Sequence, residues 1–259
     1  MSESISALAT VNTAKRYYNQ GKKYYYVKNK VKEALECFEQ AIRLDSHHIG
    51  SYAEKGNILR LLRQNNEALQ VLDMAIKLDP NYPIAYYVKA RVLVVLKCKV
   101  EAAAYYEAGT KLANNSTNSE VYFHKGAALS ALGRKQEAIV ACDEAIALNP
   151  NYANAYSGKG LDLFALGRKQ EAIVAYDKAI TLNSNYAQAY SNKGLALFAL
   201  GRKQEAIVAY DKAIALNPNY ADAYNNKGLV LADLGQKQEA IVYFDKAIAL
   251  NPDLRGCLQ

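Results

Sequence analysis

The sequence contains no tryptophan, only two methionines and three histidines, and no long uninterrupted hydrophobic run. A membrane-spanning helix needs about 20 apolar residues in succession, and no such stretch occurs, so we expect no membrane span. Residues 1–18 also lack the apolar core of about 7–15 residues that marks a secretory signal. The sequence therefore predicts a cytoplasmic protein, or one in the cytosol of a host cell if it is a secreted effector.

Proline and glycine are scarce, with 5 and 14 residues among 259. This scarcity favours helices over an all-β fold, whose turns depend on both residue types. Cys37, Cys98, Cys142 and Cys257 are scattered without a Cys-x-x-Cys pair, which predicts reduced thiols. The histidines show no metal-ligand spacing with each other or with the cysteines, so we predict neither a metal site nor a cofactor.

Sequence patterns that carry catalysis are missing as well. There is no P-loop, no Gly-x-Ser-x-Gly and no His-Glu-x-x-His. We therefore predict a protein that is not an enzyme.

A segment of 34 residues recurs along most of the chain. The stretch LFALGRKQEAIVAYDKAI occurs twice without substitution, at residues 163–180 and 197–214. Such a period indicates a repeat architecture. The units are 15–48, 49–82, 83–116, 119–152, 153–186, 187–220 and 221–254, with an insertion at 117–118. Residues 1–14 are predicted to be an N-terminal cap or a disordered segment, and residues 255–259 a C-terminal tail.

Each unit contains two helical stretches. In the fifth unit, apolar residues recur every three or four positions over about 153–166 and again over about 169–182. Gly167 lies between the stretches and suits the left-handed turn that ends a helix. Asn-Pro or Asp-Pro then ends most second stretches, because proline cannot continue a helix. We expect the two helices to pack closely at Gly160, with Leu166 buried between them.

These units resemble the tetratricopeptide repeat family, in which small, aromatic and proline residues stand at fixed positions of a 34-residue unit. The sixth unit supplies them as Tyr190, Gly194, Leu197, Gly201, Ala206, Tyr210, Ala213 and Pro218. The resemblance covers residues 15–254 as a single domain. It implies an all-α fold, a right-handed α-α superhelix of helix-turn-helix units. A helical repeat that binds RNA one base per unit has units of similar length but lacks this pattern.

Some positions depart from the family pattern. In the first unit Lys22 stands where the first glycine is expected. Position 7, usually leucine in the family, is lysine in the second to seventh units. We expect these lysines to cover apolar surface with their alkyl stems while the amine stays in water.

The resemblance implies that first helices line a concave groove with positions 2, 5, 9, 12 and 13 of each unit. In the early units this lining is basic and polar, and it includes Asn57, Arg60, Tyr87 and Arg91. In the later units it is an apolar ladder of Leu161, Phe164, Leu195, Phe198 and Leu229. The ladder is either buried between adjacent first helices or open to a partner segment. We predict a non-enzymatic protein-interaction scaffold that binds a peptide with apolar anchors and an acidic part that reaches Arg60 and Arg91.

One partner class is disfavoured. Family members that clamp the acidic C-terminal tail of heat-shock chaperones need lysine at position 5 and asparagine at position 9 of one unit, then asparagine at position 6 of the next. The second unit has Ala53 and Asn57 at the first two positions, and the third unit has Val88. No other register matches, so we do not expect this clamp.

Two further surfaces are candidate interfaces. Position 22 is valine in the last four units, which places a row on the outer face, either partly buried or available to a partner. The row consists of Val140, Val174, Val208 and Val242. Repeat arrays usually end in a polar capping helix, whereas only five residues follow Leu254. Either the sequence is a piece of a longer array, or the last helix pairs with another copy; we expect it to expose apolar residues and to mediate self-association.

The alternative function is binding of nucleic acid or another anionic surface through the first unit. Its sequence KRYYNQGKKYYYVKNKVK mixes cations with tyrosines, which suits phosphate contact and base stacking. The candidate contacts are Lys15, Arg16, Lys22 and Lys23. The other interpretation is a solvated basic helix pair whose tyrosines pack inward. A salt titration separates the two, because nucleic-acid binding weakens steeply with salt.

Overall fold

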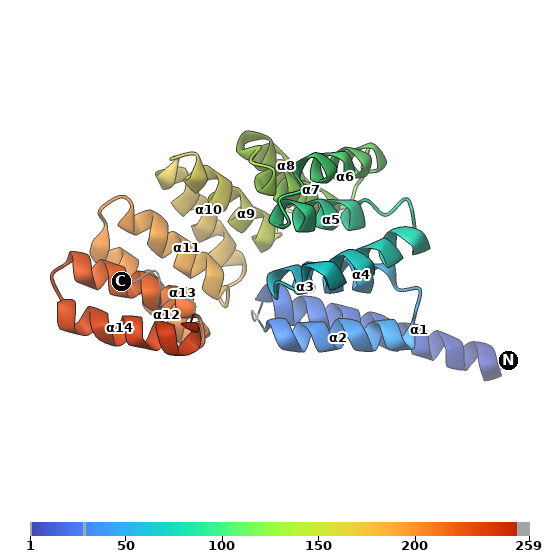
Figure 1. The fold of residues 1–259 in the computed structure, drawn as a ribbon, viewed down its shortest axis with the longest axis horizontal. Coiled ribbons are helices and arrows are strands. Elements are labelled where there is room, and N and C mark those ends of the chain that lie inside the picture. The colour runs from blue at the N-terminus through green and yellow to red at the C-terminus, as the bar shows by residue number, and fades with distance from the viewer. Residues whose placement is uncertain (1, 28–29, 253–259) are drawn as a thin grey trace. The chain divides into compact units, whose positions relative to one another are not determined.

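The computed structural model describes residues 2–27 and 30–252, and these residues form helices and no strand (Figure 1). The predicted C-terminal tail at 255–259 lies outside the described residues. The first helix, α1 (Ser2–Lys22), continues directly into a π-helical turn, η1 (Lys23–Val27). The other helices are α2 (Val31–Leu44), α3 (Ile49–Leu61), α4 (Asn65–Leu78), α5 (Pro83–Val95), α6 (Lys99–Leu112), α7 (Ser119–Ala131), α8 (Lys135–Leu148), α9 (Ala153–Ala165), α10 (Lys169–Leu182), α11 (Ala187–Phe198), α12 (Lys203–Leu216), α13 (Ala221–Asp233) and α14 (Lys237–Leu250). The predicted all-α fold of repeated helix pairs is confirmed.

The chain divides into two compact parts, unit 1 (residues 1–150) and unit 2 (residues 151–259), and each of them contains several of the 34-residue repeats. Unit 1 holds α1 to α8, and unit 2 holds α9 to α14. Within each unit the two helices of a repeat form a hairpin, and each hairpin contacts the next one along the chain. Each unit therefore buries a core between helices that are close in sequence, as expected for a repeat protein.

Two glycines of each typical repeat have separate structural tasks. A Cβ atom at Gly160 would lie 2.6 Å from Cε1 of Tyr176, a distance that real Cβ atoms do not reach. Glycine at this position therefore lets α9 and α10 approach closely. Gly167 has a φ of +79°, in the left-handed region that glycine adopts without strain, and it ends α9. Both tasks are as the sequence predicts.

The prediction that Leu166 is buried is wrong. Its side chain is 43% exposed, whereas Leu163 is 2% exposed. Leu166 is the C-cap residue of α9, so its side chain lies beyond the turns that pack against α10. Leu163, one helical turn earlier, fills the hairpin core instead.

Four of the lysines at position 7 form ion pairs with the preceding repeat, namely Lys55, Lys89, Lys193 and Lys227. Lys227 Nζ lies 2.6 Å from Asp211 Oδ1 of the preceding repeat and donates to Tyr243 Oη at 2.7 Å. Lys193 pairs with Asp177 in the same way, at 2.6 Å. In unit 1, Lys89 pairs with Asp73. The expectation that these amines stay in water is therefore wrong for the buried Lys89 and Lys227. Every repeat has an acidic residue at position 25, and this recurrence is the sequence pattern that could have predicted the ion pairs.

The first repeat accommodates one residue more than the others. The close contact between its helices falls at Gly21, where a Cβ atom would lie 2.7 Å from Cε1 of Phe38, and not at Lys22. The π-helical turn η1 begins two residues later. A π turn closes its hydrogen bonds over five residues instead of four, so it absorbs an extra residue within a helix. This insertion changes where the last residues of the first helix point.

Candidate functional site

The first helices of unit 2 expose one leucine at the same place in each repeat. Leu161 of α9, Leu195 of α11 and Leu229 of α13 are 43%, 36% and 42% exposed. Phe164 and Phe198, one turn further along α9 and α11, are half-buried. Burial between adjacent first helices therefore does not account for the leucines. They form a periodic apolar surface that we call the leucine row.

In each of these three helices the exposed leucine is followed directly by a buried residue. Asp162, Ala196 and Val230 are all buried. Consecutive residues of an α-helix lie about 100° apart around its axis, so Leu161, Leu195 and Leu229 lie at the same place beside the buried side of their helices. A row of accessible apolar side chains on rigid elements can mark an interaction site.

In unit 1 two arginines from consecutive repeats converge on one amide. Arg60 Nη2 donates to Asn57 Oδ1 at 3.3 Å, and Arg91 Nη1 donates to the same oxygen at 3.2 Å. Neither guanidinium forms an ion pair with a carboxylate of the described residues, and Arg60 Nε is buried without an acceptor. Burial and the adjacent Arg91 lower the pKa of Arg60 to about 9. Two like charges held together in this way attract an anion.

Tyr87, the fourth residue predicted for this polar lining, lies elsewhere. Its side chain is completely buried, and its ring centroid is 5.9 Å from that of Tyr106 on α6. It belongs to the core of unit 1. The rest of the predicted polar lining consists of the half-buried Arg60 and Arg91 and the buried asparagine that they share.

A buried acid and a buried histidine lie on the first helices of the same unit. Glu54 accepts a hydrogen bond from Tyr26 Oη at 3.0 Å, and its Oε1 lies 3.8 Å from His124 Nε2. Burial raises the pKa of Glu54 to about 7, opposed mainly by the charge of Lys22. Burial, with Arg91 nearby, lowers the pKa of His124 to about 3. The sequence did not indicate this pair, because nothing in the spacing of Glu54 and His124 relates them.

The basic first repeat uses most of its tyrosines internally. Tyr18, Tyr24 and Tyr25 pack against a core centred on Phe38. Tyr17 is more than a third exposed. This arrangement matches the inward-packed interpretation better than a stacking surface for bases.

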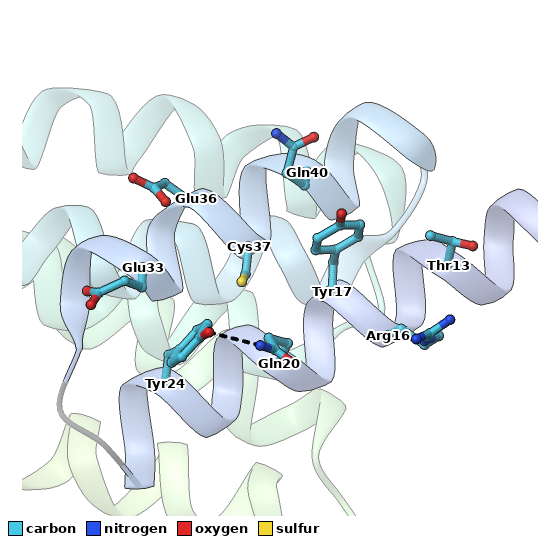
Figure 2. Close-up of a pocket in the computed structure, with 9 residues that line it drawn as sticks. All are labelled: Thr13, Arg16, Tyr17, Gln20, Tyr24, Glu33, Glu36, Cys37 and Gln40. Atoms are coloured by element: carbon cyan, nitrogen blue, oxygen red, sulfur yellow. Dashed lines mark hydrogen bonds between the residues drawn. The ribbon is translucent and has the colours of Figure 1, made fainter.

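The candidate anion contacts of the first repeat are not gathered at one place. Lys15, Arg16 and Lys23 are exposed, whereas Lys22 forms an ion pair with Glu120 of α7. Arg16 also lines a cavity of about 590 Å³ between α1 and α2 (Figure 2).

The other residues of that cavity do not favour an anion. Glu33 and Glu36 line it, and Gln20 Nε2 donates to Tyr24 Oη at 3.0 Å along one wall of it (Figure 2). Burial and the charges of Glu36 and Glu33 raise the pKa of the Cys37 thiol, so this cysteine is not an activated nucleophile.

The valines of the outer row are accessible. Each is more than half exposed, which excludes substantial burial against neighbouring alanines. Val140 belongs to unit 1, whereas Val174, Val208 and Val242 belong to unit 2. On α14, Ile241 beside Val242 is also exposed.

Neither a metal centre nor a membrane span is evident in the part of the chain that the structure describes. Over residues 2–27 and 30–252, no three His, Cys, Asp or Glu side chains are grouped so as to hold a metal ion. In the same residues, no helix combines the length and apolar character needed to cross a membrane.

These features define a helical-repeat protein in which equivalent side chains recur from one hairpin to the next. The chain belongs to the tetratricopeptide repeat family. Family models described as TPR repeat match residues 56–93, 160–201 and 194–235. Models described as tetratricopeptide repeat match residues 14–48, 119–152 and 221–254. The match that begins at residue 14 agrees with the extra residue of the first repeat. Comparison with curated proteins found no match.

Solved structures of the same family are similar to this chain. MamA is 30% identical with a TM-score of 0.53, over 63% of this chain and 95% of MamA. PilF of Pseudomonas aeruginosa is 20% identical with a TM-score of 0.58, over 79% and 92% of the two chains. A chain of the APC/C hetero-tetramer Cut9-Hcn1 is 19% identical with a TM-score of 0.64, over 89% of this chain and 45% of that one. The last two show the fold alone. The tetratricopeptide repeats matched along the chain support a protein–protein interaction scaffold.

Proposed function

We propose that the protein binds a peptide segment of a partner through the leucine row of unit 2. The observation that carries this proposal is the exposure of Leu161, Leu195 and Leu229 at the same place in three successive repeats. Burying a leucine side chain completely stabilises a complex by about 1.5–3 kcal/mol. Three partly exposed leucines therefore supply a useful share of the binding free energy of a short peptide.

The periodicity of the row determines the kind of peptide. Equivalent leucines come from hairpins of almost identical sequence, so each presents the same local surface. A partner with apolar side chains at regular intervals contacts all three in the same way. Helices and strands both place side chains at regular intervals, and many recognition segments bind their partners in one of these two conformations.

Unit 1 supplies a contact of different chemistry. Arg60 and Arg91 share the Oδ1 atom of Asn57 and have no carboxylate partner among the described residues. A carboxylate of a partner would accept hydrogen bonds from both guanidiniums, and such charge-assisted bonds are about twice as strong as neutral ones. We therefore propose an acidic side chain or an acidic terminus as the group that unit 1 binds.

The leucine row is tested with selected peptides. Peptides chosen from a displayed random 12-residue library against the whole protein are measured by fluorescence polarisation. We expect Leu195→Lys/Leu229→Lys to weaken binding of the apolar peptides at least tenfold, because a lysine amine cannot be buried against an apolar side chain. The matched control is Val174→Lys/Val208→Lys on the second helices, which should leave binding unchanged. Equal affinity of the wild type and the leucine variant would exclude the row as the binding site.

A further inference from the structure

The end of the first helix lies against the first helices of the following repeats in unit 1. We call the residues that it meets the first-helix face of unit 1. They are Glu54, Asn57 and Arg60 of α3, Arg91 of α5, and Glu120 and Phe123 of α7. All but Glu54 occupy positions for which the family resemblance implies a groove lining. The face should therefore be open to a partner, and in this chain it is not.

Three contacts hold the segment Lys22–Tyr26 on this face. Lys22 forms an ion pair with Glu120, which is 98 residues away in the sequence. Tyr26 Oη donates to both carboxylate oxygens of Glu54, at 3.0 and 3.1 Å. The ring of Tyr26 also meets that of Phe123 edge-on, with centroids 6.4 Å apart. The segment of the first repeat thus reaches the fourth repeat.

Tyr25 lies at the arginine pair. Burial raises the pKa of its hydroxyl, while the charges of Arg91 and Arg60 and a hydrogen bond with Asn57 oppose the shift. Its ring centroid lies 4.4 Å from that of Tyr26, so the two tyrosines cover the face together. Tyr25 is neutral at ordinary pH and gives the guanidiniums no counter-charge.

The π turn is the reason that both tyrosines are on this face. It absorbs the extra residue that follows the close contact at Gly21 and displaces the residues after that contact from the register of the other repeats. No other first helix in the described part of the chain contains such a turn. Single π turns in α-helices occur frequently at functional sites.

We propose that Lys22–Tyr26 is an internal ligand of the first-helix face of unit 1, which a partner peptide displaces in order to reach Arg60 and Arg91. This inference rests on the proposed peptide-binding function. The internal ligand supplies a cation for Glu120 and one aromatic ring for Phe123, but no anion for the arginines. An external peptide that also carries a carboxylate can pair with Arg60 and Arg91, which the internal ligand cannot do. This additional contact allows the external peptide to compete with Lys22–Tyr26 for the first-helix face of unit 1.

The test supplies the internal ligand as a separate molecule. The probe is a fluorescein-labelled peptide with the sequence of residues 19–30, titrated into the whole protein. We expect Tyr25→Ala/Tyr26→Ala to bind the probe at least tenfold more tightly than the wild type does, because its own segment no longer covers the face. Tyr17→Ala, which changes an exposed tyrosine of the same helix away from this face, should bind as weakly as the wild type.

A second probe examines the chemistry of the face. It is the same peptide with Glu in place of Tyr25, and we expect it to bind the double variant several-fold more tightly than the parent peptide does. That gain should vanish when Arg60→Gln/Arg91→Gln is added. Equal binding of the parent probe by the wild type and the double variant overturns the proposal. A large loss of helical circular dichroism in the double variant also overturns it, because a displaceable ligand must be dispensable to the fold. Neither result affects the leucine row of unit 2.

Discussion

Replacing Tyr210 with alanine is expected to lower the free energy of unfolding of unit 2 by about 3–5 kcal/mol. The side chain is completely buried, and its ring lies against Gly194, where a Cβ atom would be 2.8 Å from Cε1. Glycine and tyrosine form a matched pair, so neighbouring residues cannot move in to fill the space that alanine would leave. Urea denaturation followed by circular dichroism measures the loss.

Tyr210→Phe is the matched control for this prediction. The hydroxyl of Tyr210 is buried without a hydrogen-bond partner. Removing an unsatisfied buried hydroxyl relieves its desolvation cost, so we expect this variant to be as stable as the wild type or more stable, by up to about 1 kcal/mol. A loss of more than about 1 kcal/mol in Tyr210→Phe would show that the hydroxyl is hydrogen-bonded. An alanine variant of wild-type stability would contradict the packing that we describe.

Glu54→Gln is expected to become more stable relative to the wild type as pH rises. Burial raises the pKa of Glu54 from 4.5 to about 7 in the folded protein. Between these values the folded state binds more protons than the unfolded state does, so the contribution of Glu54 to stability falls as pH rises. Over the whole window the change amounts to about 3 kcal/mol. Urea denaturation of both proteins between pH 4 and pH 8 measures it.

The histidine beside Glu54 acts with the opposite sign. Burial lowers the pKa of His124 from 6.5 to about 3, so the unfolded state binds the additional proton and stability rises with pH between these values. From about pH 4.5 to 6.5 the two slopes cancel in the wild type, and Glu54→Gln exposes the rise caused by His124. Glu171→Gln is the control, because a hydrogen bond from Arg168 lowers the pKa of Glu171. Parallel pH profiles for the wild type and Glu54→Gln would show that Glu54 ionises normally.

The sequence predicts the fold well because the same helix and turn patterns recur in several repeats, so each assigned helix is supported by several copies. Gly160 and Gly167 recur with the 34-residue period, and their two tasks follow from helix packing and from left-handed backbone geometry. These inferences depend on local periodicity, which a single sequence displays directly. The sequence left open whether Leu195 is buried between first helices or exposed, and the structure decides for exposure.

Features that depend on contacts between repeats could not be predicted in the same way. Leu166 appeared to continue the apolar face of its helix, but the helix ends one residue before it. The pairing of Lys227 with Asp211 joins positions in different repeats that the family pattern treats separately. The placement of Tyr25 and Tyr26 depends on a one-residue insertion, which is visible only where the helix contacts Phe38 at Gly21.

The most direct test of the account is a methyl NMR titration of the whole protein with a peptide selected from the library. We predict that the methyl signals of Leu161, Leu195 and Leu229 shift together as the peptide is added. The signals of Val174 and Val208, which lie on second helices of the same unit, should stay in place. Shifts confined to the valines, with unchanged leucine signals, would contradict the claim that the leucine row is the binding surface.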